Sequence, residues 1–593
     1  MAGSSMTEVL QTVGDPAMPS QPAAYPVSCE VPTATTPSSP RHDRADVASK
    51  LLEFDAALDR GSSQRAAAEE AGVPRSTLRY WSARRSDLDV PGPVAAFLET
   101  PAGLAWLHRL VMAAVFVMTL RGPEGIRLVC EFLELSGLAE VVGASFGSIQ
   151  KLTLEMQEQI AAFGTEQREV LGQNMPEKPI TVCEDETFHP KPCVVAIEPA
   201  SNFILLEHYV ERRDAQTWNM ALDLALEGLP VRVIQSTSDQ GQALLRHTRD
   251  LDAHHSPDLF HPQHDLGKAT ALPLARRLRQ ATEAHEKAVR TRERLIANRD
   301  AYQTKRHGPG RPPDFAGRIE RAQQAVEESQ QAIDEALADQ KACREAISGL
   351  SADYHCYRLS DGLAQPAEQV EALIAGRFAV IDEVAERADL SQNCLAKIDK
   401  ARRVTADMVA TISFVHTEIA VRLACLDISP ELRMEMALRW VPGLYLMRVA
   451  ARAKLAEDRR ALIRTAEALL APLRAPEHPL RQLDSEAEEQ LGAVATTCAE
   501  LFQRSSSCVE GRNGQLALFH HGLHRLTDKK LAALTVIHNF HTRRPDGTTP
   551  AERFFDTEHR DLFSALLERM PQLARPAKPR SKRPYRAPRR LAV

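Results

Sequence analysis

The alternation of apolar and polar residues separates one strand-rich region from a largely helical remainder. ITVCEDETF, CVVAIE and FILLEHYV, from Ile180 onward, are β-rich runs separated by the turn signals HPKP and PASN. A helical stretch at 212–229 follows. After it come the β-branched run VRVIQSTSD, a helix from Gly241 and the short strand candidate PDLFHPQHD. Three consecutive strands followed by alternating helix and strand predict a mixed sheet covered by helices.

A long helical region interrupts this α/β pattern, because no strand-like run occurs from Lys268 to about Gln503. Residues 272–305 and 315–350 predict two long helices joined by the turn GPGRPPDF, and further helices extend over 366–470. On the second long helix, apolar and small residues at heptad spacing favour a tight antiparallel hairpin. These residues are Ile319, Ala322, Val326, Ser329, Ile333, Ala336, Cys343 and Ile347. We therefore expect an α/β core formed by residues 176–268 and 500–566, interrupted by an all-α insertion with a coiled-coil hairpin at 269–499.

The N-terminal part has a different character. Residues 1–45 are rich in Pro, Ser, Thr and Ala and predict a disordered segment. Within 46–90, RAAAEEAGVPRSTLRYWSARR reads as helix, glycine turn and helix, which predicts a helix-turn-helix module whose second helix enters a DNA major groove. The expected base-edge and phosphate contacts come from Arg75, Arg79, Arg84 and Arg85. The alternative is a small helical hairpin with a solvated basic face.

Two further segments bear on DNA binding. Residues 91–175 predict a second helical module with Ser145 and Ser148 at a helix entry. It has few cations beyond Lys151, so core packing or dimerisation explains it as well as DNA contact does. The tail at 567–593 places basic residues among prolines, which prevent a helix but allow the chain to follow phosphates. We expect DNA contacts there from Lys578, Arg580, Lys582 and Arg583; a merely solubilising tail is the alternative.

Composition narrows the class of protein. The 593-residue chain carries a net charge of −6, so any nucleic-acid surface is local. Its ten cysteines are scattered without a C-x-x-C pair, which argues against a structural zinc site or a disulfide scaffold. The most apolar stretch, Leu110–Leu120, is about half the length that spans a bilayer, and no secretory signal is evident. We expect a cytoplasmic protein that does not enter a membrane.

Three acidic residues carry the candidate chemistry. Asp185 and Asp239 end predicted strands, and Glu510 opens a predicted helix. Carboxylates gathered in this way fit a two-metal phosphoryl-transfer site, and oxygen ligands favour Mg²⁺ or Mn²⁺. Strand alternation puts Asp185 on the face opposite Glu184 and Glu186, but does not say which face points to the site. The pattern therefore leaves Asp185 and Glu186 as rivals.

The surrounding motifs resemble a known group. VCEDETF, VERRDAQTW, IQSTSDQGQALL, DLFHPQHDLGKA, SSSCVEGRNGQLALFHHGLHRL and ALTVIHNFHTRRPDGTTPAERFF look like segments of bacterial insertion-sequence transposases of the DDE type. The resemblance covers roughly residues 125–270 and 500–556, and the helical insertion is itself family-like. It implies a ribonuclease H-like catalytic core. It also implies that Asp185, Asp239 and Glu510 hold two Mg²⁺ (or Mn²⁺) ions, and it favours Asp185 over Glu186.

The resemblance also implies an activity. Such an enzyme binds the terminal inverted repeats of its element in double-stranded DNA, cleaves a strand at each end and joins the ends to target DNA. Bringing two ends together implies at least a homodimer, in a bacterial cytoplasm and associated with the nucleoid. Two alternatives remain open at this point: a non-catalytic DNA-binding regulator derived from a transposase, and a metal-dependent nuclease.

Other residues are expected to support the acids. His261, His264 and Lys268 are candidates for facing DNA, and the two histidines lack the third histidine or cysteine of a metal site. Arg512 and Asn513 lie within a turn of Glu510 and are candidates to orient it or to contact phosphate. In the insertion, we expect Trp440 to be an ordinary buried tryptophan, with stacking on a flipped base as the alternative.

Overall fold

The computed structural model describes residues 42–85, 90–188, 191–308, 310–521 and 526–576. The chain forms two compact units, the first extending to Ser86 and including Glu99–Pro101, the second containing the rest. Most of the segment expected to be disordered (1–45) lies outside the described residues, but a helix already begins at Arg44. The four basic tail residues Lys578, Arg580, Lys582 and Arg583 also lie outside them.

The first unit contains the predicted helix-turn-helix elements. Its helices are α1 (Arg44–Asp59), α2 (Gln64–Glu70) and α3 (Arg75–Arg85). Gly72 between α2 and α3 has φ +66°, a left-handed conformation that glycine adopts without steric cost. A small apolar core joins the helices, formed by Leu51, Phe54, Ala57, Ala67, Ala68, Ala71, Val73 and Leu78. The predicted helices and turn are thereby confirmed, while DNA binding stays a prediction.

The predicted second helical module shares a core with the sheet. Its main elements are α4 (Gly92–Leu98), α5 (Pro101–Phe116), α6 (Ile126–Leu135) and α7 (Phe146–Asn174), with the short π-helix η1 (Val117–Arg121) and the short 3₁₀-helix η2 (Leu138–Glu140). Ser145 caps α7 by accepting a hydrogen bond from the Ser148 backbone N–H, as expected. One continuous apolar cluster runs from Leu98 through α5 and α7 into the strands and on to Met570. These helices are therefore part of the α/β core, and a boundary at residue 175 separates no hydrophobic cores.

The sheet is mixed and five-stranded, in the order β3-β2-β1-β4-β5. Its strands are β1 (Lys178–Phe188), β2 (Pro192–Glu198), β3 (Phe203–Tyr209), β4 (Val231–Ser238) and β5 (His254–Pro257). β1, β2 and β3 form an antiparallel meander, whereas β4 pairs parallel to β1 and β5 parallel to β4. The prediction of a mixed sheet covered by helices is confirmed.

The last predicted strand needs a correction. β5 ends at Pro257, and most of PDLFHPQHD belongs to helix α10 (Phe260–Gln303) instead. The Asp258 side chain accepts a hydrogen bond from the Phe260 backbone N–H at 2.8 Å, which supports the turn into the helix. Pro262 lies in the first turn of α10, where a missing N–H costs no helical hydrogen bond.

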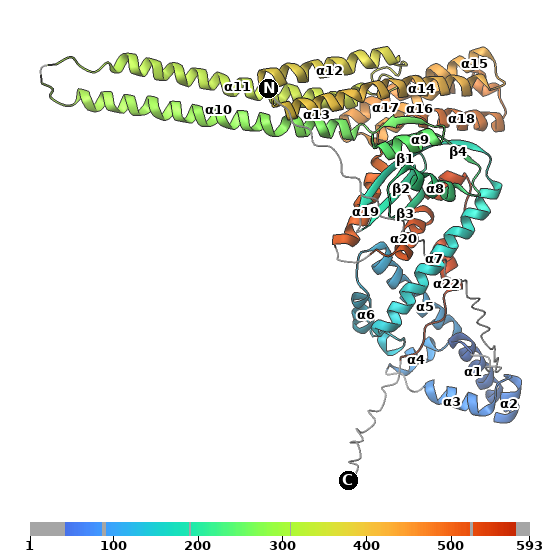
Figure 1. Ribbon diagram of the computed structural model, residues 1–593. Coiled ribbons are helices and arrows are strands. Elements are labelled where there is room, and N and C mark those ends of the chain that lie inside the picture. Colours follow the sequence, from blue (N-terminus) through green and yellow to red (C-terminus); the bar gives the residue numbers. More distant parts are fainter. Residues whose placement is uncertain (1–41, 86–89, 189–190, 309, 522–525, 577–593) are drawn as a thin grey trace, which may run out of the picture. The chain divides into compact units, whose positions relative to one another are not determined.

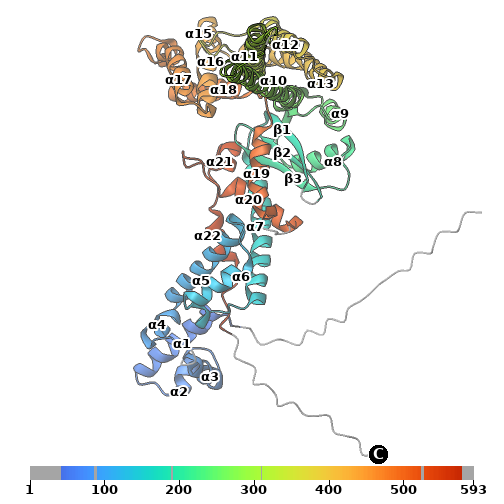
Figure 2. The ribbon, with the colours of Figure 1, turned by 90° about the vertical axis from the view of Figure 1, so that its left-hand side faces the viewer.

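Helices cover both faces of the sheet (Figure 2). On one face lie α8 (Ala215–Leu226), capped by Asp214, and α9 (Gln242–Asp250). On the other face lie α19 (Ser507–His521) and α20 (Asp528–Phe540), followed by α21 (Pro550–Phe555) and α22 (Leu562–Arg569). The Asn539 side chain pairs with both backbone groups of Ile204, at 2.9 Å each, which fixes α20 against β3.

The insertion is all-helical apart from a single β-bridge, as far as its described residues extend. α10 and α11 (Phe315–Asp353) form the predicted long antiparallel hairpin (Figure 1). The remaining helices are α12 (Ala367–Arg387), α13 (Gln392–Arg403), α14 (Thr405–Ala424), α15 (Pro430–Glu435), η3 (Met436–Trp440), α16 (Val441–Arg452), α17 (Ala456–Leu470), η4 (Ala471–Arg474), η5 (Pro479–Gln482) and α18 (Ser485–Glu500). They share their own core. Trp440 is half-buried at its edge and lies beside Gly492, as an ordinary packing residue does.

The two ends of the insertion meet beside the sheet. The Leu259 backbone N–H donates to the Arg504 carbonyl at 3.0 Å, and the Ser256 hydroxyl donates to the Gln503 carbonyl at 2.9 Å. We call this pairing of Ser256–Leu259 with Gln503–Ser506 the neck. The chain therefore leaves and re-enters the α/β core at one place.

Two helical stretches in the described part of the chain are long and apolar enough to cross a membrane. They are Pro101–Arg121, with 56% of its most apolar window buried, and Gln392–Ala424, with 33%. The first extends beyond the apolar stretch Leu110–Leu120 and contributes Val111, Met112 and Val115 to the sheet core. Both stretches are consistent with core helices of a soluble protein. The nine cysteines among the described residues are free thiols.

Candidate functional site

Three aspartates stand level where the parallel pairing of adjacent strands ends. Asp239 and Asp258 directly follow β4 and β5, but Asp185, predicted to end its strand, lies inside β1, which continues to Phe188. Cys183 pairs with Thr237 in the β1–β4 ladder, so two residues further on Asp185 is level with Asp239. Ser238 pairs with Pro257 in the β4–β5 ladder, so Asp239 is level with Asp258, whose N–H donates to the Ser238 carbonyl at 2.9 Å. Neighbouring strands lie about 4.8 Å apart. The fold therefore brings Asp185 and Asp239 together and adds Asp258 to them.

The geometry separates Asp185 from its rival Glu186. Glu186 points to the α8 face, where it accepts from Arg213 at 2.8 Å and from the Trp218 ring N–H at 3.3 Å. Side chains alternate between faces along a strand, so Asp185 points to the opposite, α19-covered face together with Cys183. Cys183 confirms this direction, because its thiol lies 3.7 Å from the Ser505 carbonyl just before α19. Glu186 is therefore structural, and Asp185 belongs to the acidic cluster.

Glu510 approaches from α19, which packs on β1 and β2. It lies in the first turn of that helix and is exposed. The start of α19 is held by Ser506, whose hydroxyl donates to the buried carboxylate of Asp258. Asp258 thus anchors the helix that carries Glu510 to the end of β5.

Burial and neighbouring carboxylates together determine the electrostatics of the cluster. Burial is the largest effect on Asp185 and, with repulsion from Asp239 and Asp258, raises its pKa to about 6. Burial and the negative charge of Asp258 likewise raise the pKa of Glu510. His261 opposes both shifts, and its Nε2 lies 3.9 Å from a carboxylate oxygen of Asp258. Asp185, Asp239, Asp258, His261 and Glu510 therefore form one electrostatic group, which we call the acidic cluster.

The donor set of the acidic cluster fits a hard divalent cation. Its carboxylate oxygens are the ligands that Mg²⁺ and Mn²⁺ prefer, and a bound cation would offset the repulsion that Asp185 feels from Asp239 and Asp258. One oxygen of Asp185 accepts from the Glu186 N–H and one of Asp239 from the Gly241 N–H, both at 2.8 Å. Across the described residues, no three potential ligand side chains stand close enough to enclose one ion.

The three candidate supporting residues on α10 lie at increasing distances from the acidic cluster along the helix. By helical spacing, His261, His264 and Lys268 lie along one stripe, and the stripe rises about 1.5 Å per residue. His261, in the first turn, is one of the electrostatic influences on Asp185 and Glu510. His264 and Lys268 are exposed and lie near Asp265, whose carboxylate accepts from Lys400 of α13 at 2.8 Å. These two residues face solvent beside the cluster rather than within it.

The expectation for Arg512 needs correction. Its guanidinium makes two hydrogen bonds with the buried carboxylate of Glu207 on β3, at 2.8 and 2.6 Å, and is itself buried. Residues two apart on a helix point in nearly opposite directions, so Arg512 cannot share the direction of Glu510. Arg512 thus fastens α19 to the sheet and is not available to a phosphate. Asn513, three residues from Glu510, has a buried Oδ1 without a hydrogen-bond partner in the described structure.

The candidate DNA-binding arginines of α3 differ in their surroundings. Arg75 and Arg79 are exposed. Arg84 lies over the Tyr80 ring, 5.8 Å from its centre. Arg85 is engaged in an ion pair with Asp55 of α1. Arg85 therefore helps to hold α3 against α1, and Arg75 and Arg79 are the better candidates for DNA contact.

Sequence reasoning missed Asp258, although a signal existed. An aspartate directly after a strand, followed by a proline in the first turn of a helix, is typical of a strand-to-helix turn. Treating PDLFHPQHD as one strand concealed this arrangement. The placement of β5 beside β4 makes Asp258 the third member of the row.

Comparison with known families adds one finding. A family model described as a family of unknown function, DUF6399, matches residues 436–582. The matched stretch begins in η3, continues through α16, α17 and α18, and includes α19 with Glu510. It spans well under half of the chain, so it shows a similarity in this stretch only. No curated protein matches the chain.

Proposed function

We propose that this protein is a DDE-type DNA transposase with a ribonuclease H-like core, which uses divalent cations to cleave and transfer DNA strands. The observation that supports this most directly is the level row of Asp185, Asp239 and Asp258, with Glu510 approaching from α19. The mixed sheet with a large helical insertion between the strands and α19 agrees with the fold that the sequence resemblance implies.

Each residue of the acidic cluster has a distinct role in this proposal. Asp185, Asp239 and Glu510 would hold two Mg²⁺ or Mn²⁺ ions. Two bound cations would supply the charge stabilisation for the attacking and leaving oxygens of an in-line displacement at phosphorus. Asp258 positions α19 through Ser506. His261 lies beside Asp258 and lowers the pKa of both Asp185 and Glu510, which favours the ionised carboxylates.

Substrate binding would involve both units of the chain. The exposed Arg75 and Arg79 of α3 are suited to a DNA groove, and the exposed His264 and Lys268 lie along α10 next to the acidic cluster. Two element ends must be joined to one target, so we propose a homodimer or higher oligomer as the active form, in a bacterial cytoplasm.

Cleavage of the element's own ends tests this function. The substrate is a duplex carrying the terminal inverted repeats found beside the gene, incubated with protein and Mg²⁺. We expect nicking at the repeat end by the wild type, and its loss in Asp185→Asn, in Asp239→Asn and after chelation of the metal. Glu186→Gln is the matched control, because it changes the neighbouring acid that faces α8 and should keep activity.

The outcomes separate the alternatives. Equal nicking by wild type and Asp239→Asn would refute the proposal. Protection of the repeats without metal-dependent cleavage would indicate a DNA-binding regulator. Cleavage of RNA–DNA hybrids without preference for the repeats would indicate a nuclease.

A further inference from the structure

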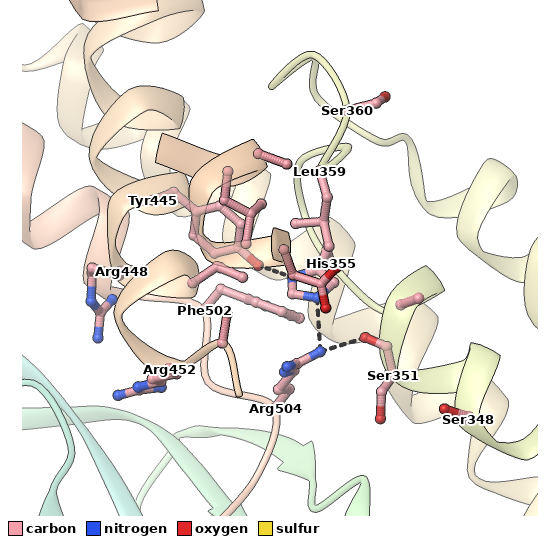
Figure 3. A pocket seen from close by; sticks show the side chains of 16 residues that line it. Ser348, Ser351, His355, Leu359, Ser360, Tyr445, Arg448, Arg452, Phe502 and Arg504 are labelled. Atoms are coloured by element: carbon pink, nitrogen blue, oxygen red, sulfur yellow. Dashed lines mark hydrogen bonds between the residues drawn. The ribbon is translucent and has the colours of Figure 1, made fainter. Parts of the chain in front are cut away.

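Several arginines of the helical insertion hold its own parts together. Arg504 donates to Nε2 of His355 at 2.8 Å and to the Ser351 carbonyl (Figure 3). Arg448 donates to the Ala499 carbonyl at 2.7 Å. These guanidiniums are engaged within the chain. The outer side of α10 carries cations in a different situation.

Three of these cations form a line along α10, beyond Pro273. They are Arg276, Lys287 and Arg294, which are eleven and seven residues apart. Those spacings are about three and about two helical turns, so the three side chains leave the helix on the same side. All three are exposed, and none makes an ion pair in the part of the chain that the structure describes.

The line faces away from the partner helix of the hairpin. His285 bonds to Ser329 of α11 at 3.1 Å, which marks the side of α10 that meets α11. Arg276 and Arg294 are each nine residues from His285, and nine residues are two and a half turns. Both arginines therefore point to the side opposite α11.

Two further arginines lie beside the line, three residues after Arg276 and four before Arg294. They are Arg279 and Arg290, each paired with a glutamate one turn away, at 3.8 and 3.5 Å. Like charges three or four residues apart on a helix repel each other, so a counter-charge along this side stabilises the helix. We call the set the basic edge: Arg276, Arg279, Lys287, Arg290 and Arg294.

The opposite edge of the hairpin is acidic. Glu320, Glu327 and Asp334 of α11 follow one another at intervals of seven residues, are exposed and make no ion pair among the described residues. Glu320 is nine residues from Ser329, so this acidic edge also faces away from the seam. The hairpin thus separates its charges across its width. A polyanion is attracted to one edge and repelled by the other.

We propose that the basic edge binds the phosphate backbone of duplex DNA, an inference that rests on the proposed function. Along the helix, the cations of the line stand ~17 and ~11 Å apart, too far to share one phosphate, so a ligand that contacts all three is extended. Duplex DNA carries one negative charge per about 1.7 Å of its axis.

The origin of α10 connects the basic edge to the proposed chemistry. His261, beside Asp258 of the acidic cluster, lies in the first turn of this helix. The basic edge therefore holds DNA that flanks the cleaved bond. The acidic edge of a second copy is the competing occupant, but its carboxylates are ~10 Å apart along the helix, a far lower charge density than that of DNA.

Binding of the full chain to duplex DNA in EDTA tests the proposal without cleavage. The probe is a fluorescent duplex of about 30 base pairs that lacks the terminal repeats, long enough to span the basic edge. The variant Arg276→Gln/Lys287→Gln/Arg294→Gln changes exposed positions to a good helix former. We expect weaker binding, and a decrease of about three in the slope of log affinity against log salt concentration, because each lost phosphate contact removes about 0.9.

The matched control, Arg318→Gln/Arg321→Gln/Lys341→Gln, removes the same charge from exposed positions of α11 and should keep the wild-type slope. Neutralising the acidic edge, by Glu320→Gln/Glu327→Gln/Asp334→Asn, should not weaken binding. Thermal melts verify that each variant folds.

Two results would overturn the proposal: an unchanged slope in the basic-edge variant, or an equal decrease in the α11 control. An unchanged slope together with self-association that both edge variants abolish in sedimentation would assign the basic edge to a second copy instead. The proposed function is judged separately, because cleavage in Mg²⁺ that is insensitive to Asp239→Asn refutes it, whereas the slope in EDTA reports on the basic edge alone.

Discussion

Replacing Asp185 by asparagine should stabilise the protein while removing its metal response. The carboxylate is half-buried beside Asp239 and Asp258, and these surroundings raise its pKa from 3.8 to about 6. The Glu186 N–H donates to Oδ1 of Asp185, and an asparagine oxygen accepts the same hydrogen bond. The substitution therefore removes the charge and retains the local backbone contact.

The magnitude follows from the shift in pKa. The folded chain binds this proton more tightly than the unfolded chain does. As pH rises from about 4 to about 6, the free energy of unfolding of the wild type therefore falls by ~3 kcal/mol through this group. Partial solvent exposure makes that value an upper bound. Above pH 6 the whole cost is present, so Asp185→Asn should gain up to ~3 kcal/mol there, and the gain should vanish below about pH 4.

Urea unfolding of the full chain at pH 8 and pH 4, each with and without Mg²⁺, measures the effect. We expect the midpoint of Asp185→Asn to exceed that of wild type at pH 8, and Mg²⁺ to raise only the wild-type midpoint. Glu186→Gln serves as the control and should lose a little stability, because it weakens the contacts with Arg213 and Trp218. An Asp185→Asn variant no more stable than wild type at pH 8 would refute the argument that burial and repulsion dominate this carboxylate.

Three further predictions concern contacts elsewhere in the chain. Arg512→Met should lower the free energy of unfolding by ~3–5 kcal/mol because Glu207 is left buried without its cationic partner, with the Thr535 hydroxyl still bonded to it. Adding Glu207→Gln should restore part of that loss in urea titrations. Gly164→Ala on α7 should lower the free energy of unfolding by about 1–3 kcal/mol, because the new methyl group would lie 2.3 Å from Val536. The control is Gly147→Ala on the same helix, whose new methyl group meets no atom within 4 Å and should cause no loss of stability. Thermal melts compare the two variants, and equal melting temperatures would contradict the close approach of α7 and α20. The double variant Arg75→Ala/Arg79→Ala should weaken binding to duplex DNA and reduce the slope of log affinity against log salt concentration by about two. The control Arg65→Ala, at an exposed arginine on α2, should change neither quantity. Fluorescence anisotropy over a salt series measures both, and an unchanged slope in the double variant would exclude α3 from phosphate contact.

Periodicity was sufficient to locate the sheet and the hairpin. The β-branched runs that became β1 and β4 are long and bounded by turn residues, so local sequence alone identifies them. The heptad seam of α11 likewise predicts its antiparallel partner. Asp239 could be located because it directly follows such a run, whereas Asp185, predicted to end its run, lies inside β1.

Residues whose role depends on tertiary direction were not predictable in the same way. Arg512 is near Glu510 in sequence, but the helix turns it toward Glu207 on a strand some 300 residues earlier. The choice between Asp185 and Glu186 needed the contact of Glu186 with Trp218, which no local pattern contains. Asp258 required the register of β5 against β4, and a strand of four residues gives too weak a signal to establish it.

The neck has a mechanical consequence. A backbone hydrogen bond joins Leu259 to Arg504, next to the contact between Asp258 and Ser506. A force or torque on the helical insertion therefore acts on the α/β core at these residues. The same closeness means that a short turn of a few residues is long enough to reconnect the core if the helices are removed. A shortened chain of this kind would separate the properties of the α/β core from those that the helical insertion adds.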